Sequence, residues 1–173
     1  CRTLLRRNHK EPPPAVLTEL DRLADKALTA DSMDSLLGIE GAAARTYFSE
    51  FQGMLKTDSI AFDFHGRNRR PPRDPVNAVL SFLYAMLIKQ AMVTALAVGF
   101  DPYLGFYHQP KYGKPALALD LAEEFRPLIA DSVCISLINN GELTSEQVIA
   151  RGGAVALTQH GRRKVIESYE RRM

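Results

Sequence analysis

The stretch from residue 75 to residue 98 limits most strongly how this chain can fold, because its only charged residue is Lys89. Asp74 and Pro75 mark where it begins, since Asp is a favoured N-cap residue and proline fits the first helical position. Gly99 marks where it ends, because glycine commonly follows the last turn of a helix. The sequence therefore predicts one long and nearly uncharged helix.

A helix of this length could also cross a bilayer. Polar side chains inside the stretch argue against a membrane span, as does the strongly basic sequence before it. The polar residues are Asn77, Ser81, Lys89, Gln90 and Thr94. We therefore predict the buried central helix of an all-helical domain, with no membrane partner.

Apolar residues recur at helical spacing in several other parts of the chain. The predicted helices cover residues 15–29, 32–54 and 159–172, and another begins near Ala116 and continues or restarts through residues 129–138. Thr144 and Gln147 match a capping box, which predicts a short helix that Gly152 and Gly153 end. With 173 residues and 46% apolar content, the chain can bury the core of one all-α domain.

The net charge of +2 says little about partners, but the basic residues are clustered. Such clusters fit a polyanionic partner. For any single cluster, solvated surface is the more common explanation. The clusters are Arg2, Arg6, Arg7 and Lys10; Arg67, Arg69, Arg70 and Arg73; and Arg162, Arg163 and Lys164. The second cluster follows His65 and Gly66 in a predicted loop, where guanidinium groups match phosphate oxygens.

The cysteine content favours a reducing compartment, so we expect a cytoplasmic protein. Cys1 and Cys134 form neither a disulfide framework nor a metal-ligand spacing. No signal-peptide pattern is present. Because the first residue is Cys and a proline run follows closely, we expect this chain to be a piece of a longer polypeptide.

Glu40 breaks the apolar pattern of the helix predicted over residues 32–54. It falls in line with Met33, Ala44 and Phe51, where the pattern calls for a hydrophobic residue. Burying an unpaired carboxylate costs several kcal/mol, so Glu40 needs a partner, a proton or a metal. A salt bridge to an arginine and a functional role remain equally open. The flanking Gly38 and Gly41 weaken a helix and indicate close approach to this backbone.

The stretch from Gly105 to Pro127 combines a basic loop with a helix that begins near residue 116. Leu117, Leu121, Phe125 and Leu128 form one apolar stripe on that helix. Asp120 and Glu123 lie three residues apart and are therefore neighbours on one face. His108 precedes them and can ligate a metal. A lone histidine is more often structural, so a site here needs a third group from elsewhere in the chain.

Three segments together resemble a known family. They are GIEGAAARTYFSEF around Glu40, GRNRRPPRDPVNAVLSFLYAML around Asn77 and GFYHQPKYGKPALALDLAEEFRP around His108. In this order they resemble the CRISPR-associated adaptation integrase, Cas1, and the likeness extends over nearly the whole chain from Ser32 onward. The family inserts new spacers into CRISPR arrays and so serves antiviral defence.

The resemblance implies an all-α catalytic domain that follows a separate β-rich dimerisation domain, and we expect this chain to correspond to the catalytic domain without the β-rich one. We expect one domain over residues 1–173, with an N-terminal segment and first helix over 1–31 and the catalytic core over 32–173. The family's metal ligands fall on Glu40, His108 and Glu123, where the third position is often aspartate. Asp120 is then a supporting or an alternative ligand. Oxygen ligands with one imidazole suit Mg²⁺ or Mn²⁺.

The implied reaction is attack of a DNA 3′-hydroxyl on a phosphodiester, with endonuclease activity from the same site. The implied partners are double-stranded DNA (prespacer and CRISPR repeat), a second copy of the chain and the Cas2 protein. Candidates for gripping the DNA backbone are Arg67, Arg69, Arg70, Arg73, Lys111 and Lys114. Two alternatives remain: a non-catalytic DNA-binding or assembly module, and a metal-dependent hydrolase of small phosphates.

Overall fold

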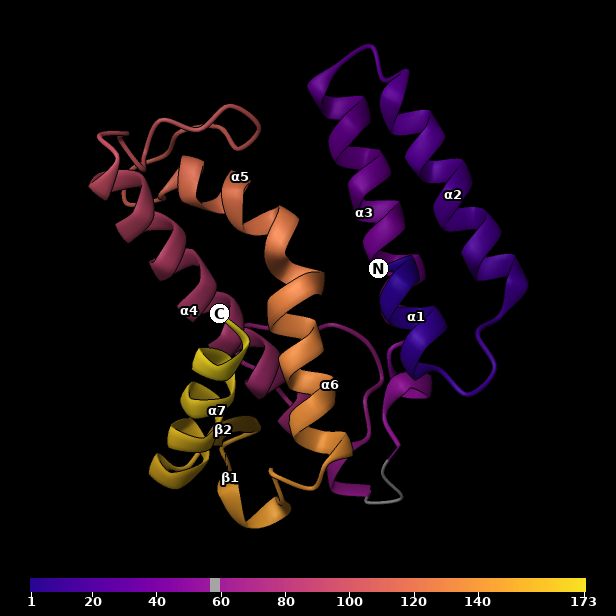
Figure 1. Ribbon diagram of the computed structural model, residues 1–173, viewed down its shortest axis with the longest axis vertical. Helices are drawn as coiled ribbons and strands as arrows, with labels where there is room; N and C mark the ends of the chain where they lie inside the picture. Colours follow the sequence, from indigo (N-terminus) through magenta and orange to yellow (C-terminus); the bar gives the residue numbers. More distant parts are fainter. Residues whose placement is uncertain (57–59) are drawn as a thin grey trace. The chain divides into compact units, whose positions relative to one another are not determined.

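The computed structural model describes residues 1–56 and 60–173. It divides into two compact units, Cys1–Arg67 and Asn68–Met173. The division that we expect after residue 31, between the entry segment and the catalytic core, stays a prediction. The helices on its two sides pack against each other within the first unit (Figure 1). The prediction of a single domain over the whole chain stays a prediction.

The first unit is built on an antiparallel pair of helices (Figure 1). Its elements are α1 (Arg2–Asn8), α2 (Pro14–Leu28), α3 (Met33–Ser49) and the 3₁₀ turns η1 (Gln52–Met54) and η2 (Ile60–Phe62). The helices predicted over residues 15–29 and 32–54 are confirmed, although the second ends earlier and is followed by η1. The sequence did not predict α1. The loop predicted around residues 56–74 includes residues 57–59, which lie outside the described residues.

Aromatic rings form a core at the C-terminal end of α3. Tyr47, Phe51 and Phe64 are buried, and neighbouring ring centroids lie 5.1 Å apart for Phe51 and Phe64. Such ring pairs add to the free energy of burial. The residues that follow α3 are therefore anchored, even where they form no long helix.

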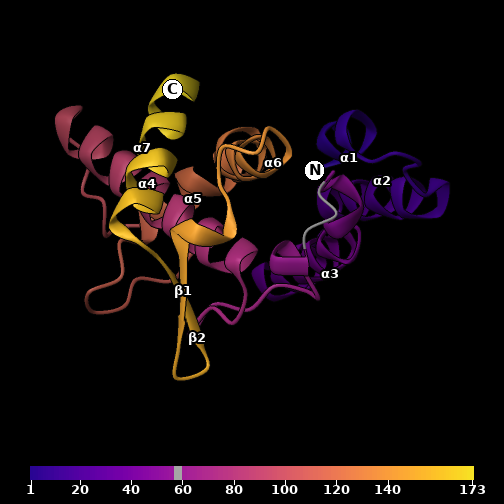
Figure 2. The same cartoon turned by 90° about the horizontal axis from the view of Figure 1, so that it is seen from below.

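The second unit is helical apart from one hairpin. Its elements are α4 (Pro75–Ala97), α5 (Ala116–Phe125), η3 (Arg126–Asp131), α6 (Ser132–Asn139), η4 (Ser145–Gln147), β1 (Val148–Arg151), β2 (Ala154–Leu157) and α7 (Gln159–Arg172). α4 packs against α5, η3 and β2, and the hairpin projects from the helices (Figure 2). The predicted all-α class is confirmed apart from this hairpin, whose two strands have four residues each.

Both ends of α4 are as predicted. The Asp74 side chain accepts a hydrogen bond from the backbone N–H of Asn77 at 2.8 Å, Pro75 is the first helical residue, and Gly99 follows with φ +88°. The first half of the helix supplies much of the core, whereas Val93 and Leu96 near its end are more than half exposed. Among the described residues, only α4 is long and apolar enough to cross a membrane, a test that core helices also pass.

The apolar stripe predicted on residues 117–128 is not the buried face of this segment. Leu121, Phe125 and Leu128 are 41%, 46% and 59% exposed. The buried residues of α5 are instead its alanines, Ala116, Ala118 and Ala122. Small side chains let α5 lie close to α4, so packing distance and not hydrophobicity selected the inner face.

The short helix predicted after residue 144 is wrong beyond its first turn. The capping box of Thr144 and Gln147 is present but opens only η4. The chain then forms β1 and β2, because Gly152 and Gly153 both have positive φ, +59° and +75°. Two such residues suit the two-residue turn of a hairpin between β-branched strands. The continuation of the helix past Pro127 is confirmed, as the π-helical segment η3.

Candidate functional site

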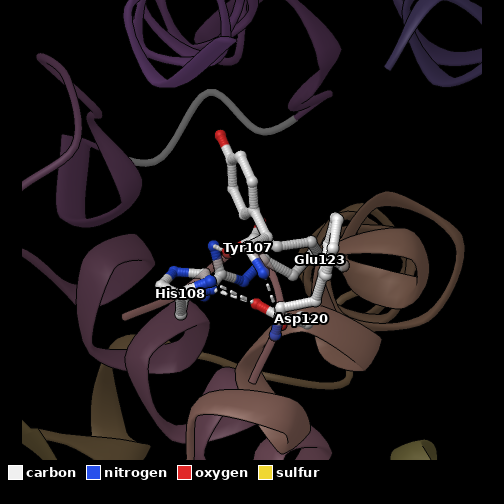
Figure 3. A network of polar contacts seen from close by, with 6 residues as sticks. Tyr107, His108, Asp120 and Glu123 are labelled. Atoms are coloured by element: carbon white, nitrogen blue, oxygen red, sulfur yellow. Dashed lines mark hydrogen bonds and ion pairs between the residues drawn. The ribbon is translucent and has the colours of Figure 1, made fainter. Parts of the chain in front are cut away.

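One carboxylate of α5 organises the loop that carries the predicted histidine. Asp120 accepts hydrogen bonds from the backbone N–H groups of Phe106, Tyr107 and His108 at 2.7, 2.9 and 2.8 Å. Figure 3 shows these contacts between the helix and the loop. Three successive donors on one side chain fix the path of the backbone. The loop before α5 is therefore held in one conformation where His108 leaves it.

The start of this loop is also pressed against α5. A Cβ atom at Gly105 would lie 2.5 Å from the Cβ atom of Ala116 and 2.8 Å from the carbonyl oxygen of His108. No side chain fits there, which explains the glycine. The carbonyl oxygen of Pro102 accepts a hydrogen bond from the N–H of Leu117 at 3.0 Å. The first turn of α5 thus ties down both sides of the loop.

The imidazole of His108 is bound to the same carboxylate. Its Nδ1 atom lies 2.7 Å from Oδ1 of Asp120, and the two side chains are only 18% and 13% exposed. Burial raises the pKa of Asp120. The hydrogen bonds from the His108 ring and from the three backbone N–H groups outweigh this effect, so the pKa lies below its ordinary value.

The contact with Asp120 indicates which ring nitrogen of His108 carries a proton. An ionised carboxylate only accepts hydrogen bonds, so Nδ1 of His108 must carry the proton that it donates to Asp120. The neutral ring then has its lone pair on Nε2, the atom that can bind a metal. Metal-binding histidines are commonly oriented by a carboxylate in this way. The arrangement favours Asp120 as a supporting residue over its alternative role as a ligand.

Glu123 lies one turn further along α5, on the side predicted from its spacing. Its Oε1 atom lies 2.5 Å from Nη1 of Arg126, and both side chains are about one-quarter exposed or less. A carboxylate has two oxygens and about four acceptor positions, so an ion pair with Arg126 does not by itself prevent Glu123 from binding a metal. His108 and Glu123 therefore provide one nitrogen and one carboxylate from the same part of the second unit.

These groups are fewer than a complete metal site requires. Within the second unit, all of which is described, no three His, Cys, Asp or Glu side chains are grouped to hold an ion. The remaining predicted ligand, Glu40, belongs to α3 in the first unit, where its side chain is half-buried. The ligand set Glu40, His108 and Glu123 stays a prediction. Within the first unit, a Cβ at Gly38 would meet nothing within 4 Å, so that unit itself does not require this glycine.

The arginine-rich loop is fixed to the start of α4 by a network that the sequence did not predict. Oδ2 of Asp74 accepts hydrogen bonds from Nδ2 of Asn68 at 2.9 Å and from Nδ2 of Asn77 at 2.7 Å. Oδ1 of Asn77 accepts from the backbone N–H of Asn68, and Oδ1 of Asn68 accepts from that of Arg73. Asn77 is fully buried. The available signal was an amide in the first turn of a nearly apolar helix, three residues after the Asp74 cap.

The predicted DNA-binding side chains lie in two places. Arg69, Arg70 and Arg73 are exposed in the loop at the start of the second unit, and Arg67 ends the first unit half-buried. The backbones of Lys111 and Lys114 form an isolated β-bridge across a tight turn that contains Gly113 at φ +70°. The cations before α4 and those after His108 are thus carried on ordered loops.

The comparisons with known proteins decide the family. The sequence matches the family described as "CRISPR associated protein Cas1" over residues 1–171. The chain belongs to the Cas1 family. It is 50% identical to a Cas4 exonuclease/Cas1 endonuclease fusion of Geobacter sulfurreducens, over all of this chain and 33% of that protein. This Cas1 chain therefore spans about a third of the length of that relative.

Two solved structures share the fold of this Cas1 chain. A partial Cas6-RT-Cas1–Cas2 complex matches with a TM-score of 0.88 and 30% identity over 99% of this chain and 52% of the other. A casposase bound to an integration product matches with a TM-score of 0.77 and 30% identity, over 91% and 48% of the two chains. The fold predicted from the three sequence segments is confirmed.

Proposed function

We propose that the protein is a metal-dependent DNA integrase and endonuclease of CRISPR adaptation. It inserts new spacer DNA by attack of a 3′-hydroxyl oxygen on a phosphodiester. The attacking hydroxyl gives up its proton as its oxygen forms the new P–O bond, and the 3′ oxygen of the broken strand leaves and takes up a proton. The observation that carries this proposal is the orientation of His108 by Asp120, one helical turn from Glu123.

Glu40, His108 and Glu123 would hold Mg²⁺ or Mn²⁺. Such an ion polarises the phosphate and neutralises the charge that develops on the leaving oxygen. The fit rests on the donors, since the Nε2 lone pair of His108 and the oxygens of Glu123 form the mixed set that these ions accept. Asp120 keeps the ring in its ligating tautomer and holds the loop against α5.

The cations on the two loops would bind the DNA backbone. Arg69, Arg70 and Arg73 are exposed, and the Asn68–Asp74–Asn77 network holds the loop that carries them. Arg67, Lys111 and Lys114 would add further phosphate contacts. Guanidinium and ammonium groups on ordered backbone bind phosphate without ordering a loop at the moment of binding.

The proposed partners are double-stranded DNA, a second copy of the chain and the Cas2 protein, in the cytoplasm. Integration as the reaction is supported by the likeness to a casposase bound to an integration product. Cas2 as a partner is supported by the likeness to a complex that contains it. We propose integration and the binding of these partners for the longer protein of which this chain would be a part.

The test is a strand-transfer assay with a labelled DNA end, a target that carries a CRISPR repeat, Cas2 and Mn²⁺. We expect Glu40→Ala, His108→Ala and Glu123→Ala to abolish joined products while DNA binding is retained. Glu124→Ala is the matched control, because Glu124 is an exposed neighbour on α5. Unchanged joining by His108→Ala would end the assignment in favour of a non-catalytic DNA-binding module. Phosphate release from nucleotides without DNA would favour a small-phosphate hydrolase.

A further inference from the structure

The π-helical segment η3 is fastened at both ends to one residue of α4. Its first residue, Arg126, places its guanidinium carbon 5.0 Å from the centre of the Tyr84 ring. Its last residue, Asp131, accepts a hydrogen bond from the Tyr84 hydroxyl at 2.7 Å. Asp131 is only 2% exposed, so this bond is shielded from water. Tyr84 thus contacts both the first and the last residue of the π-helical segment.

The guanidinium held by Tyr84 is the one that pairs with Glu123. Nη1 of Arg126 lies 2.5 Å from Oε1 of Glu123. Nε of Arg126 is buried and has no hydrogen-bond partner among the described residues. A buried donor without a partner costs free energy, so this side chain is not placed here to be solvated by water. The position is instead explained by its two defined contacts, the ring of Tyr84 and the carboxylate of Glu123.

Arginine suits this position better than lysine does. A planar guanidinium can stack on an aromatic ring and bind a carboxylate with its edge at the same time. The ammonium of lysine is a point charge on a flexible stem, so it does not combine both contacts with one fixed orientation. The geometry therefore depends on the shape of the cation as well as on its charge.

We infer that Arg126 is a positioning residue. Tyr84, itself hydrogen-bonded to Asp131, holds Arg126 in place so that it sets the orientation of the Glu123 carboxylate. This inference rests on the proposed function, in which Glu123 binds the metal. In the inferred arrangement, the Glu123 side chain loses little rotamer freedom when an ion binds, because Arg126 has already ordered it. π-helical segments are often found at functional sites, and here the segment brings both anchors onto one tyrosine.

Two effects of Arg126 on metal binding have opposite signs. As a nearby positive charge it repels a divalent cation, so removing it should tighten binding if charge alone matters. As a positioning residue it orders the ligand, so removing it should weaken binding. Partners that orient a metal ligand typically change affinity by about 10- to 100-fold. The sign of the change therefore separates the two roles.

The experiment measures Mn²⁺ affinity of the whole protein by calorimetry, together with the thermal midpoint of unfolding. We expect Arg126→Ala and Arg126→Lys each to weaken binding at least about 10-fold. Tyr84→Phe keeps the ring but loses the bond to Asp131, and we expect a smaller loss, about threefold. The matched control is Arg163→Lys, since Arg163 is exposed and forms a surface pair with Glu167. It should bind as the parent does.

Tighter binding by Arg126→Ala with parental binding by Arg126→Lys would overturn the inference in favour of charge alone. A lower unfolding midpoint with parental affinity would overturn it in favour of a purely structural role. If Arg126→Ala does not fold, the Mn²⁺ affinities of Arg126→Lys and Tyr84→Phe test the inference instead. Parental Mn²⁺ binding that is abolished by His108→Ala but unaffected by all these variants would refute the inference alone. Absence of saturable Mn²⁺ binding in the parent would refute both it and the proposed metal site.

Discussion

The Nδ1 atom of His108 lies 2.7 Å from Oδ1 of Asp120, on a carboxylate that also accepts three backbone N–H groups of the same loop. One side chain therefore determines both the path of the loop and the tautomer of the ring that it carries. The position of Asp120 in α5 makes this possible, because the loop folds back across the first turns of the helix. The histidine is ordered before any ligand arrives.

We predict that Asp120→Asn weakens Mn²⁺ binding by about 10- to 100-fold, because the ring is no longer held by a charged acceptor. The asparagine oxygen can still accept some of the backbone hydrogen bonds, so the loop should remain folded. Calorimetric titration of the purified protein measures the effect. Glu124→Gln, which neutralises an exposed carboxylate on the same helix, serves as control. Equal affinities of Asp120→Asn and the parent would show that Asp120 does not support the histidine.

The sequence predicted elements whose ends are fixed locally. α4 begins at Pro75 after the Asp74 cap and ends before Gly99, and α7 spans Gln159–Arg172 as predicted. Caps, proline at the first position and glycine after the last turn act within a few residues, so they can be recognised from the sequence alone. These helices, with α2, define most of the fold class.

Features that depend on distant parts of the chain were missed. The inner face of α5 is made of alanines because α4 lies close to it, and no property of α5 alone favours them over Leu121 or Phe125. The bond from the backbone of Phe106 to Asp120 spans 14 residues and needs the folded loop. His108, Asp120 and Glu123 could be named from the sequence, but the partner of each could not.

The low pKa of Asp120 makes part of the protein's stability depend on pH. Because the folded-state pKa lies below the ordinary value of 3.8, the stabilisation is fully present above that value and is lost as the pH falls through the lower folded-state value. We therefore expect the difference in unfolding free energy between the parent and Asp120→Asn to be constant from pH 7 to about pH 5 and to shrink toward pH 3. Urea unfolding at several pH values measures it. A difference that grows on acidification would contradict the assigned direction.

The buried amide of Asn77 should contribute strongly to stability. Asn77→Ala leaves the backbone N–H of Asn68 without its acceptor and removes a donor to Asp74. We expect a loss of about 2 to 3 kcal/mol in the unfolding free energy. Denaturant unfolding checks this value, with Thr94→Ala at an exposed position of the same helix as control. A change no larger than that of the control would mean that the network does not stabilise the loop.

The exposed arginines before α4 should govern how DNA binding responds to salt. Each phosphate contact releases counterions, so the slope of log affinity against log salt concentration changes by about 0.9 per contact. If Arg69, Arg70 and Arg73 each bind a phosphate, replacing all three by alanine should make the slope shallower by about 3. Fluorescence anisotropy with labelled duplex DNA between low and moderate salt measures both affinity and slope. Arg22→Ala is the control, since Arg22 is exposed on α2 and already paired with Glu19. Weaker binding with an unchanged slope would show that the arginines act through the fold of the loop and not through phosphate contacts.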